Sequence, residues 1–408
     1  MRTRVLSGMR PTGSMHLGHY LGALKNWVRL QDEHECFFFV ADWHALTTHY
    51  DEREVIGQSV YEMVIDWLAA GLDPDKSTIF LQSRLPEHAE LFTLLAMGTP
   101  LGWLERVPTY KDQMEKLKDR DLATYGFLGY PLLQAADILI YKATYVPVGE
   151  DQASHVELTR EVARRFNHLY GRGAGFEGRV AAALAKFSKD DQRYYDRQRK
   201  AFGETGAHEA WAKGEALVRR NAAALSAGTA PGGWSEMETE LLLGHLKGSG
   251  RSVLVEPQAL HTEVLKLPGL DGAKMSKSYG NAVLMRDDAD TVSKKIRGMA
   301  TAPARVRRTD PGDPAKCPVW DFHVAYSDEP TKAWVQQGCK SAGIGCLECK
   351  QPVIDSIVTQ QKPWRERAAA LTAEPKKVHW IVENGTERAR VVAKQTMKDV
   401  REAMGLDY

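Results

Sequence analysis

Two short motifs far apart in the chain carry the residue types that phosphate chemistry needs. The first is His-Leu-Gly-His at residues 16–19, and the second is Lys-Met-Ser-Lys-Ser at residues 274–278. Histidines can donate hydrogen bonds to charge that develops on phosphate oxygens, and two mobile lysines can close over a pyrophosphate. Either motif alone is better explained by ordinary core or solvated side chains. Their joint occurrence predicts chemistry at the phosphates of a nucleotide.

The first motif stands at the start of a predicted helix. Residues 3–7 predict a strand and residues 8–13 a turn, and from Leu17 onward apolar residues recur at helical spacing. A helix N-terminus presents unpaired amides and the positive end of a dipole, which together attract anions. Gly18 would let a polyphosphate or an adenine ring approach the backbone closely. We therefore expect a nucleotide to bind at this turn.

Composition sets the broad class. A chain of 408 residues, 43% hydrophobic and 26% charged, is ordinary for a globular protein of two or more domains. The net charge of +1 leaves no overall nucleic-acid signature, so any RNA surface must be local. The basic segment 291–310 is one candidate, with a solvated helix and loop as the alternative. There is no apolar leader and no run of the ~18 apolar residues that a membrane helix needs, so we expect a cytoplasmic protein.

The order of predicted elements indicates an α/β fold. Buried strands at 36–42 and 77–82 flank a helix at 51–70, which predicts a doubly wound, Rossmann-like parallel sheet with ligands at the carboxyl ends of its strands. Residues 171–250 have Gly-Ala-rich character and predict a mostly helical insert, with helices at 180–202 and 208–225. The sheet is expected to resume at 252–255, and everything from 289 onward predicts helix. The expected segments are 1–170, 171–250, 251–288 and 289–408.

The motif pair resembles the signature pair of class I aminoacyl-tRNA synthetases. Further segments are similar to bacterial-type tryptophanyl-tRNA synthetases over most of the chain outside the insert; they are residues 7–13, 130–138, 147–152, 156–160, 268–272 and 401–406. The resemblance implies activation of L-tryptophan with ATP and Mg²⁺, then transfer to tRNA(Trp), by a homodimer. It also implies that residues 1–170 and 251–288 form the catalytic domain and that 289–408 form an α-helical anticodon-binding domain.

The resemblance assigns roles to individual residues. The catalytic residues it implies are His16, His19, Lys111, Lys274 and Lys277. The ATP-binding residues it implies are Arg10, Pro11, Thr12, Gly18, His19, Gly149, Glu150, Asp151, Leu265, Lys274, Met275, Ser276, Lys277 and Ser278. The tryptophan-binding residues it implies are His44, Tyr130, Gln134, Asp137 and Gln152. Two of these stay open: Lys111 can equally be a surface lysine, and Arg10 stands where many relatives carry a neutral amide.

Asp137 lies on an otherwise apolar predicted helix. A buried carboxylate without a partner is costly, so we expect it to be paired. By resemblance its partner is the indole N–H of tryptophan, and this pairing would reject side chains that lack the donor. The alternative is an aspartate that pairs only with the protein.

Four cysteines cluster in the C-terminal region. Cys317, Cys339, Cys346 and Cys349 form the pattern C-x21-C-x6-C-x2-C, whereas Cys36 falls in a predicted buried strand. In a cytoplasmic protein such thiols favour a metal site over disulfides. The spacing resembles a subset of tryptophanyl-tRNA synthetases that carry a [4Fe–4S] cluster. Structural zinc and unligated thiols are the alternatives.

Other functions remain as rivals. A tyrosyl-tRNA synthetase shares both signature motifs, but the single Asp137 and the Gly-Glu-Asp-Gln sequence at 149–152 disfavour it. Small-molecule adenylyltransferases carry a related turn but are much shorter. A catalytically inactive RNA-binding paralogue is disfavoured because both histidines and both lysines of the motifs are present.

Overall fold

The computed structural model describes residues 3–50, 53–108, 110, 124–149, 153–173, 175–226, 233–261, 265–303 and 305–408. The chain divides into two compact units, each of which is described by itself. Unit 1 comprises Met1–Arg84, Pro147–Asp151 and Leu260–Ala389, and unit 2 comprises Leu85–Val146, Gln152–Ala259 and Arg390–Tyr408. Among the described residues, no helix combines the length and the apolar character that crossing a membrane requires.

A five-stranded sheet with the order β3-β2-β1-β4-β5 provides the frame. Neighbouring strands β1 and β2, and likewise β2 and β3, pair in parallel. All residues of β3, and all but the first of β2, are buried, as expected for parallel strands covered on both faces. This confirms the predicted α/β class. The strands are β1 (Arg4–Met9), β2 (Glu35–Val40), β3 (Ser77–Leu81), β4 (Tyr145–Val148) and β5 (Gln258–His261).

The helix predicted from Leu17 forms in three pieces: α1 (Leu17–His19), a π-helical turn (Tyr20–Leu24) and α2 (Lys25–Glu33). Trp27 of α2 stacks on Phe38 of β2 with ring centroids 4.5 Å apart, and it meets Trp67 edge-on at 5.1 Å. Trp67 belongs to α4 (Arg53–Ala70), which follows α3 (Asp42–His49). These aromatic contacts fix α2 and α4 against the sheet and so position the turn that carries the first motif.

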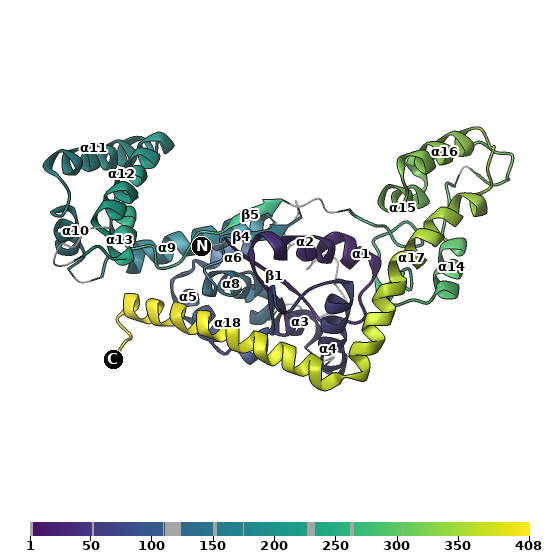
Figure 1. Ribbon diagram of the computed structural model, residues 1–408, viewed down its shortest axis with the longest axis horizontal. Coiled ribbons are helices and arrows are strands. Elements are labelled where there is room, and N and C mark those ends of the chain that lie inside the picture. Colours follow the sequence, from purple (N-terminus) through teal and green to yellow (C-terminus); the bar gives the residue numbers. More distant parts are fainter. Residues whose placement is uncertain are drawn as a thin grey trace. The chain divides into compact units, whose positions relative to one another are not determined.

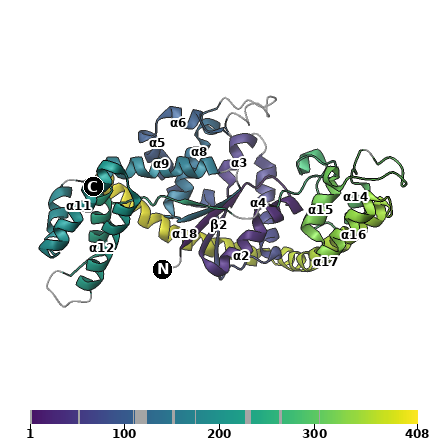
Figure 2. The same ribbon diagram turned by 90° about the horizontal axis from the view of Figure 1, so that it is seen from above.

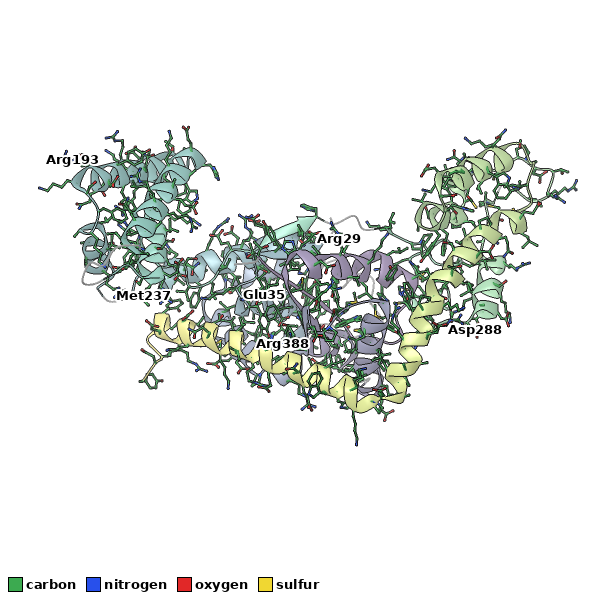
Figure 3. The ribbon with its side chains drawn as sticks, viewed as in Figure 1. Arg29, Glu35, Arg193, Met237, Asp288 and Arg388 are labelled. Carbon is green, nitrogen blue, oxygen red and sulfur yellow. The ribbon has the colours of Figure 1, made fainter. Side chains whose placement is uncertain are left out.

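Most of unit 1 from Ala289 onward is helical. Its long helix α17 packs against α4, α14, α15 and α16. Arg388 of α18, labelled in Figure 3, donates to the carbonyls of Pro74 and Ser77 at 2.7 and 2.9 Å, next to the start of β3. These helices are α14 (Ala289–Gly298), α15 (Pro318–Tyr326), α16 (Glu329–Lys340), α17 (Cys346–Ala373) and α18 (Pro375–Met404).

Unit 2 begins with helices that pack on one another: α5 with α8, and α8 with α9 (Figure 1). Four further helices enclose a separate apolar core that includes Phe176, Tyr195, Val218 and Leu242. Among them α11 and α12 lie side by side (Figure 2). The bounds are α5 (Glu87–Gly98), α6 (Leu101–Glu105), α8 (Tyr125–Ile140), α9 (Ala153–Tyr170), α10 (Phe176–Leu184), α11 (Lys189–Thr205), α12 (His208–Ser226) and α13 (Glu236–Leu246).

Two details of the sequence prediction were wrong. The helix predicted at 180–202 is broken, because the Ser188 side chain accepts from the backbone N–H of Asp191 and begins a new helix there. The strand predicted at 252–255 is instead β5, which starts at Gln258. The backbone N–H groups of Val253 and Leu254 donate to Asn167 Oδ1 at 2.9 and 3.0 Å, so a side chain takes the place of a neighbouring strand.

Candidate active site

The two signature motifs meet in unit 1. The backbone N–H of Leu17 donates to the carbonyl of Val283 at 2.9 Å, and the N–H of Met285 donates to the carbonyl of Met15 at 3.0 Å. His16 and Leu284 form the antiparallel bridge between these two bonds. The segment that follows the lysine motif is therefore tied to the residues that begin the helix of the histidine motif.

The two histidine rings stack on each other, and their pKa values are lowered. Their rings stack with centroids 3.7 Å apart, and the backbone N–H of His16 donates to His19 Nδ1 at 3.2 Å. Burial, with Lys274 adding to it, lowers the pKa of His16 to about 4. Burial, then His16 and Lys274, lowers the pKa of His19 to about 3. Because Nδ1 of His19 accepts, its Nε2 carries the proton and can donate to a phosphate oxygen.

Two glycines allow the lysine motif to approach the histidine motif. A Cβ at Gly18 would lie 3.0 Å from His16 Nδ1 and 3.7 Å from Met275 Sδ. Gly13 has a φ of +116°, which side chains other than hydrogen rarely adopt, and a Cβ there would lie 3.4 Å from Lys277 Nζ. Lys274 and Lys277 are exposed, whereas Met275 is buried. The two lysine side chains are thus exposed to solvent, near the buried His16 and the half-buried His19.

Asn281 holds the lysine loop, a role that the sequence motifs did not reveal. Its side chain is 4% exposed. Oδ1 accepts from the backbone N–H of Ser276 at 2.8 Å, and Nδ2 donates to the Lys274 carbonyl at 3.1 Å and to Asp271 Oδ1 at 2.8 Å. The only sequence signal is a polar residue placed directly after Gly280, at the point where an apolar run begins.

Other predicted nucleotide-binding residues also belong to unit 1. Arg10 is exposed, and its Nη1 lies 3.4 Å from Oγ1 of Thr48. Thr48 belongs to α3 and lies one helical turn after His44, which is buried. In the turn after Arg10, Pro11 is buried and Thr12 exposed, while Leu265 is half-buried. Gly149 is the last described residue after β4. The predicted residues Lys111, Glu150, Asp151 and Gln152 lie outside the described residues, as does the side chain of Ser278.

Three predicted tryptophan-binding residues share one face of α8 in unit 2. Tyr130, Gln134 and Asp137 follow one another at helical spacing. Tyr130 and Gln134 are half-buried, whereas Asp137 is 1% exposed. The Tyr130 ring lies 5.6 Å from the ring of His155 on α9.

Asp137 has a protein partner that the sequence did not reveal. His88 Nδ1 on α5 lies 2.6 Å from Asp137 Oδ1, and His88 Nε2 lies 2.7 Å from the hydroxyl of Tyr141. The cost of burying a carboxylate predicted that some partner exists. The sequence did not show that this partner is His88, because His88 lies 49 residues away in the chain.

The four C-terminal cysteines gather in unit 1. Cys349 interacts electrostatically with the other three, and burial together with those thiols raises its pKa to about 12. Arg305 Nη1 lies 3.7 Å from Cys339 Sγ, and His323 Nε2 lies 3.4 Å from Cys349 Sγ. All four are free thiols. In the described residues, however, no three His, Cys, Asp or Glu side chains stand in an arrangement that could hold a metal ion.

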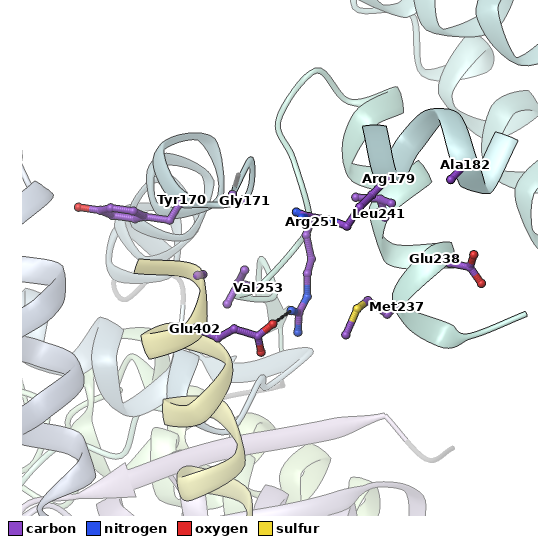
Figure 4. Close-up of a pocket in the computed structure, with 12 residues that line it drawn as sticks. Tyr170, Gly171, Arg179, Ala182, Met237, Glu238, Leu241, Arg251, Val253 and Glu402 are labelled. Atoms are coloured by element: carbon purple, nitrogen blue, oxygen red, sulfur yellow. Dashed lines mark ion pairs between the residues drawn. The ribbon is translucent and has the colours of Figure 1, made fainter. Parts of the chain in front are cut away.

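Unit 2 also contains a cavity of about 400 Å³ that the sequence did not predict. Residues of α9, α10, α13 and the end of α18 line it together with Arg251, as Figure 4 shows. Arg251 lies 3.5 Å from Glu240, 3.6 Å from Asp399 and 3.9 Å from Glu402. Because this cation is surrounded by carboxylates, the wall is an ion-pair network that ties α13 to the last turns of α18.

Comparisons with known proteins show the family to which the chain belongs. The family model for tRNA synthetases class I (W and Y) matches residues 1–193 and 239–360. A tryptophan–tRNA ligase of Ralstonia nicotianae is 61% identical, with 99% of each chain covered. A tryptophan–tRNA ligase of Thermotoga maritima is 42% identical, with 99% of this chain and 100% of the relative covered. The crystal structure of tryptophanyl-tRNA synthetase from Campylobacter jejuni complexed with ADP and tryptophan is similar, with 28% identity, a TM-score of 0.71 and coverage of 99% and 100%.

Proposed function

This chain belongs to the bacterial tryptophan–tRNA ligases of the class I tRNA synthetase family, and we propose how its residues perform the two half-reactions. The carboxylate of L-tryptophan attacks the α-phosphorus of ATP, which enters as its Mg²⁺ complex, and pyrophosphate leaves. The terminal adenosine hydroxyl of tRNA(Trp) then attacks the carbonyl of tryptophanyl-adenylate, and AMP leaves. The observation that carries this proposal is the meeting of residues 15–17 with 283–285 in unit 1, which puts both motifs at one place.

Phosphate chemistry falls to the two motifs. Little covalent work is required of the protein, so positioning and charge stabilisation supply most of the rate. Neutral His16 and His19 donate hydrogen bonds, while Lys274 and Lys277 neutralise the charge that builds on the departing pyrophosphate. Lys111 is proposed to assist. The further ATP contacts proposed are Arg10, Pro11, Thr12, Gly18, Gly149, Glu150, Asp151, Leu265, Met275, Ser276 and Ser278.

Tryptophan is proposed to be selected by Asp137, whose carboxylate accepts the indole N–H. The burial of this carboxylate supports the role, since a competing side chain without a donor would leave the acid short of a partner. Tyr130 and Gln134 are proposed to line the pocket from the same face of α8. His44 and Gln152 complete the proposed set.

We propose that residues 289–408 read the anticodon of tRNA(Trp) and that the enzyme works in the cytoplasm as a homodimer. The Campylobacter relative binds ADP and tryptophan, which supports the same small substrates here. The family model omits residues 194–238, and this supports an insert within the proposed bounds 171–250.

The four-cysteine group is proposed to hold a [4Fe–4S] cluster, with zinc or unligated thiols as the alternatives. Cys317, Cys339, Cys346 and Cys349 would be the ligands. Two observations support this proposal: four thiols are the ligand type that such a cluster takes, and the other three cysteines lie near enough to Cys349 to raise its pKa further, after burial. Such a cluster would supply a fixed cross-link between α15, α16 and α17. Iron near four per chain in an anaerobic preparation supports the cluster, whereas stoichiometric zinc or no metal rejects it.

The decisive test of function is pyrophosphate exchange into ATP with each amino acid in turn. We expect exchange that depends on tryptophan, followed by charging of tRNA(Trp). Faster exchange with tyrosine would make the enzyme a tyrosyl-tRNA synthetase, and no exchange with any amino acid would indicate an inactive paralogue.

A further inference from the structure

The buried polar chain in unit 2 is the feature of the molecule that the reaction described above leaves unexplained. Asp137 on α8, His88 on α5 and Tyr141 directly after α8 are 1%, 0% and 0% exposed. The two helices that carry them pack on each other (Figure 1). Three polar side chains that are buried together need hydrogen bonds to one another, because burial removes the hydrogen bonds that each would make to water.

When His88 is neutral, the hydrogen bonds of this chain have one direction. His88 Nδ1 faces Asp137 Oδ1 at 2.6 Å, and an ionised carboxylate only accepts, so Nδ1 carries the proton. In the neutral imidazole the other nitrogen then accepts, and Nε2 faces the Tyr141 hydroxyl at 2.7 Å. Burial, and then the charge of Asp137, raise the pKa of Tyr141 well above its ordinary value, so its hydroxyl keeps the proton that it donates. The order is Tyr141 to His88 to Asp137.

The Asp137 carboxylate is a group that can accept more than one hydrogen bond. Each of the two carboxylate oxygens can accept hydrogen bonds, so the bond from His88 orients the carboxylate without occupying all of its acceptor positions. The neighbours of Asp137 on α8 are apolar and buried, among them Ala135, Ala136 and Ile138. A carboxylate held by a fixed bond in an apolar wall presents a defined orientation to an incoming N–H. A carboxylate without that bond would rotate more freely and would bind the N–H less well.

We propose that His88 is a positioning residue for tryptophan selection, which fixes the Asp137 carboxylate for the indole N–H while Tyr141 fixes the tautomer of His88. This inference rests on the proposed role of Asp137 as the indole acceptor. His88 itself does not touch the substrate. It acts through Asp137, and its loss should therefore be felt in the recognition of tryptophan and hardly at all in the recognition of ATP.

The test uses pyrophosphate exchange by the full-length enzyme. His88→Leu removes both ring nitrogens at similar volume, and His88→Asn keeps an N–H near the place of Nδ1. We expect His88→Leu to raise the KM for tryptophan about 10- to 30-fold, because a charge-assisted hydrogen bond is lost, while the KM for ATP changes less than about 2-fold. His88→Asn should recover part of the loss. Tyr141→Phe should raise the KM for tryptophan about 3-fold.

A second buried Tyr–His pair in unit 2 supplies a matched control. The Tyr195 hydroxyl lies 3.0 Å from His245 Nδ1 and donates to the Leu242 carbonyl at 2.7 Å, and Tyr195 is 0% exposed. Tyr195→Phe makes the same chemical change as Tyr141→Phe, in helices that carry no proposed substrate contact. It should leave both KM values unchanged.

The preference of the enzyme for tryptophan over an analogue without the indole N–H is a second measurement, which would not change if His88 had only a structural role. The amino acid with a benzothiophene ring replaces the indole N–H by sulfur and has nearly the same shape. The wild type should prefer tryptophan strongly, and His88→Leu should narrow that preference. An unchanged preference, or KM values for tryptophan and ATP that rise in parallel, would overturn the proposal.

The outcomes separate the inference from the function on which it rests. If the wild type shows no exchange with tryptophan, the proposed function fails and the inference falls with it. If the wild type exchanges but the variants keep its KM for tryptophan and its preference, only the inference fails. Should His88→Leu not fold, the comparison of Tyr141→Phe with Tyr195→Phe decides the question, because both variants keep the ring and the packing.

Discussion

The proposed phosphate site of unit 1 and the proposed amino-acid site of unit 2 handle charge in opposite ways. In unit 1 the cations Lys274 and Lys277 are exposed on a loop, next to the buried His16 and the half-buried His19, whose lowered pKa values keep them neutral at neutral pH. In unit 2 the carboxylate of Asp137 is buried and is bonded to a buried histidine. The proposed phosphate site thus has its cations exposed to water, whereas the proposed amino-acid site has its acidic group buried.

The difference follows from what each proposed site would recognise. Phosphate charge develops and departs during the reaction, and exposed, mobile lysines can follow it at little cost. The indole N–H is a single weak donor on an apolar ring, so only a desolvated acceptor distinguishes it from a C–H. We therefore expect mutations of the lysine loop in unit 1 to act on kcat and mutations of Asp137 and its partners in unit 2 to act on the KM for tryptophan.

The largest expected effect is on the lysine loop. Lys277→Ala should lower the kcat of pyrophosphate exchange by about 10²- to 10³-fold, the range seen when one donor to developing charge is removed, with little change in the KM for tryptophan. Steady-state exchange kinetics measure both values. Lys376→Ala, at an exposed lysine of the same unit, is the control and should be unaffected. A similar loss at Lys376 would contradict a specific role of the loop.

The next largest effect is on the buried acid. Asp137→Asn keeps the shape but replaces an ionised acceptor by an amide, and the KM for tryptophan should rise about 10- to 100-fold while kcat falls less. The comparison of KM values for tryptophan and ATP is the measurement. Asp190→Asn, at a surface aspartate of unit 2 that is 93% exposed, is the matched control. The contrast between the units breaks down if Asp137→Asn lowers kcat alone.

Prediction from the sequence succeeded where the physics is local and failed where it depends on tertiary contacts. The sheet, the helix after the first motif and the acidic residue on α8 could be predicted, because hydrophobic periodicity and the cost of a buried charge act along the chain. His88 and Asn281 could not be found in this way. Each makes its contacts through the fold, and nothing in the residues beside them marks a histidine or an asparagine as a partner. The strand misplaced at 252–255 has the same cause, since Asn167 takes up its backbone groups.

A smaller effect is expected at the anchor of the lysine loop. Asn281→Ala removes three hydrogen bonds from the loop, and the kcat of exchange should fall about 10-fold because the lysines spend less time in place. Asn281→Asp keeps the acceptor for the Ser276 N–H but sets a carboxylate against Asp271, so it should not restore activity. Full activity of either variant would show that the loop needs no anchor.

The smallest effect on activity is the pH response of the two histidines. With pKa values lowered to about 4 and about 3, both rings stay neutral at neutral pH, so kcat should show no histidine titration between pH 6 and pH 8. The consequence appears in stability instead. In the unfolded chain the histidines take up protons at their ordinary pKa of 6.5, whereas in the folded chain they stay neutral at that pH. Their contribution to the free energy of unfolding is therefore fully present above pH 6.5. It is lost as the pH falls toward about 4.

Urea unfolding at pH 7 and pH 5 measures this loss, which we expect to be about 2 kcal/mol for the pair after allowance for partial solvent exposure. The double variant His16→Asn, His19→Asn should show a smaller difference between the two pH values. The wild type and the double variant both contain Asp66, whose effect on stability has the opposite sign. Burial raises the pKa of Asp66 to about 6, so the free energy that its ionisation costs the folded state becomes smaller as the pH falls. Subtracting the variant from the wild type removes that contribution. If the free energy of unfolding falls equally between pH 7 and pH 5 in the wild type and the double variant, His16 and His19 do not have lowered pKa values. The proposed contrast between neutral histidines in unit 1 and a buried acid in unit 2 would then be wrong.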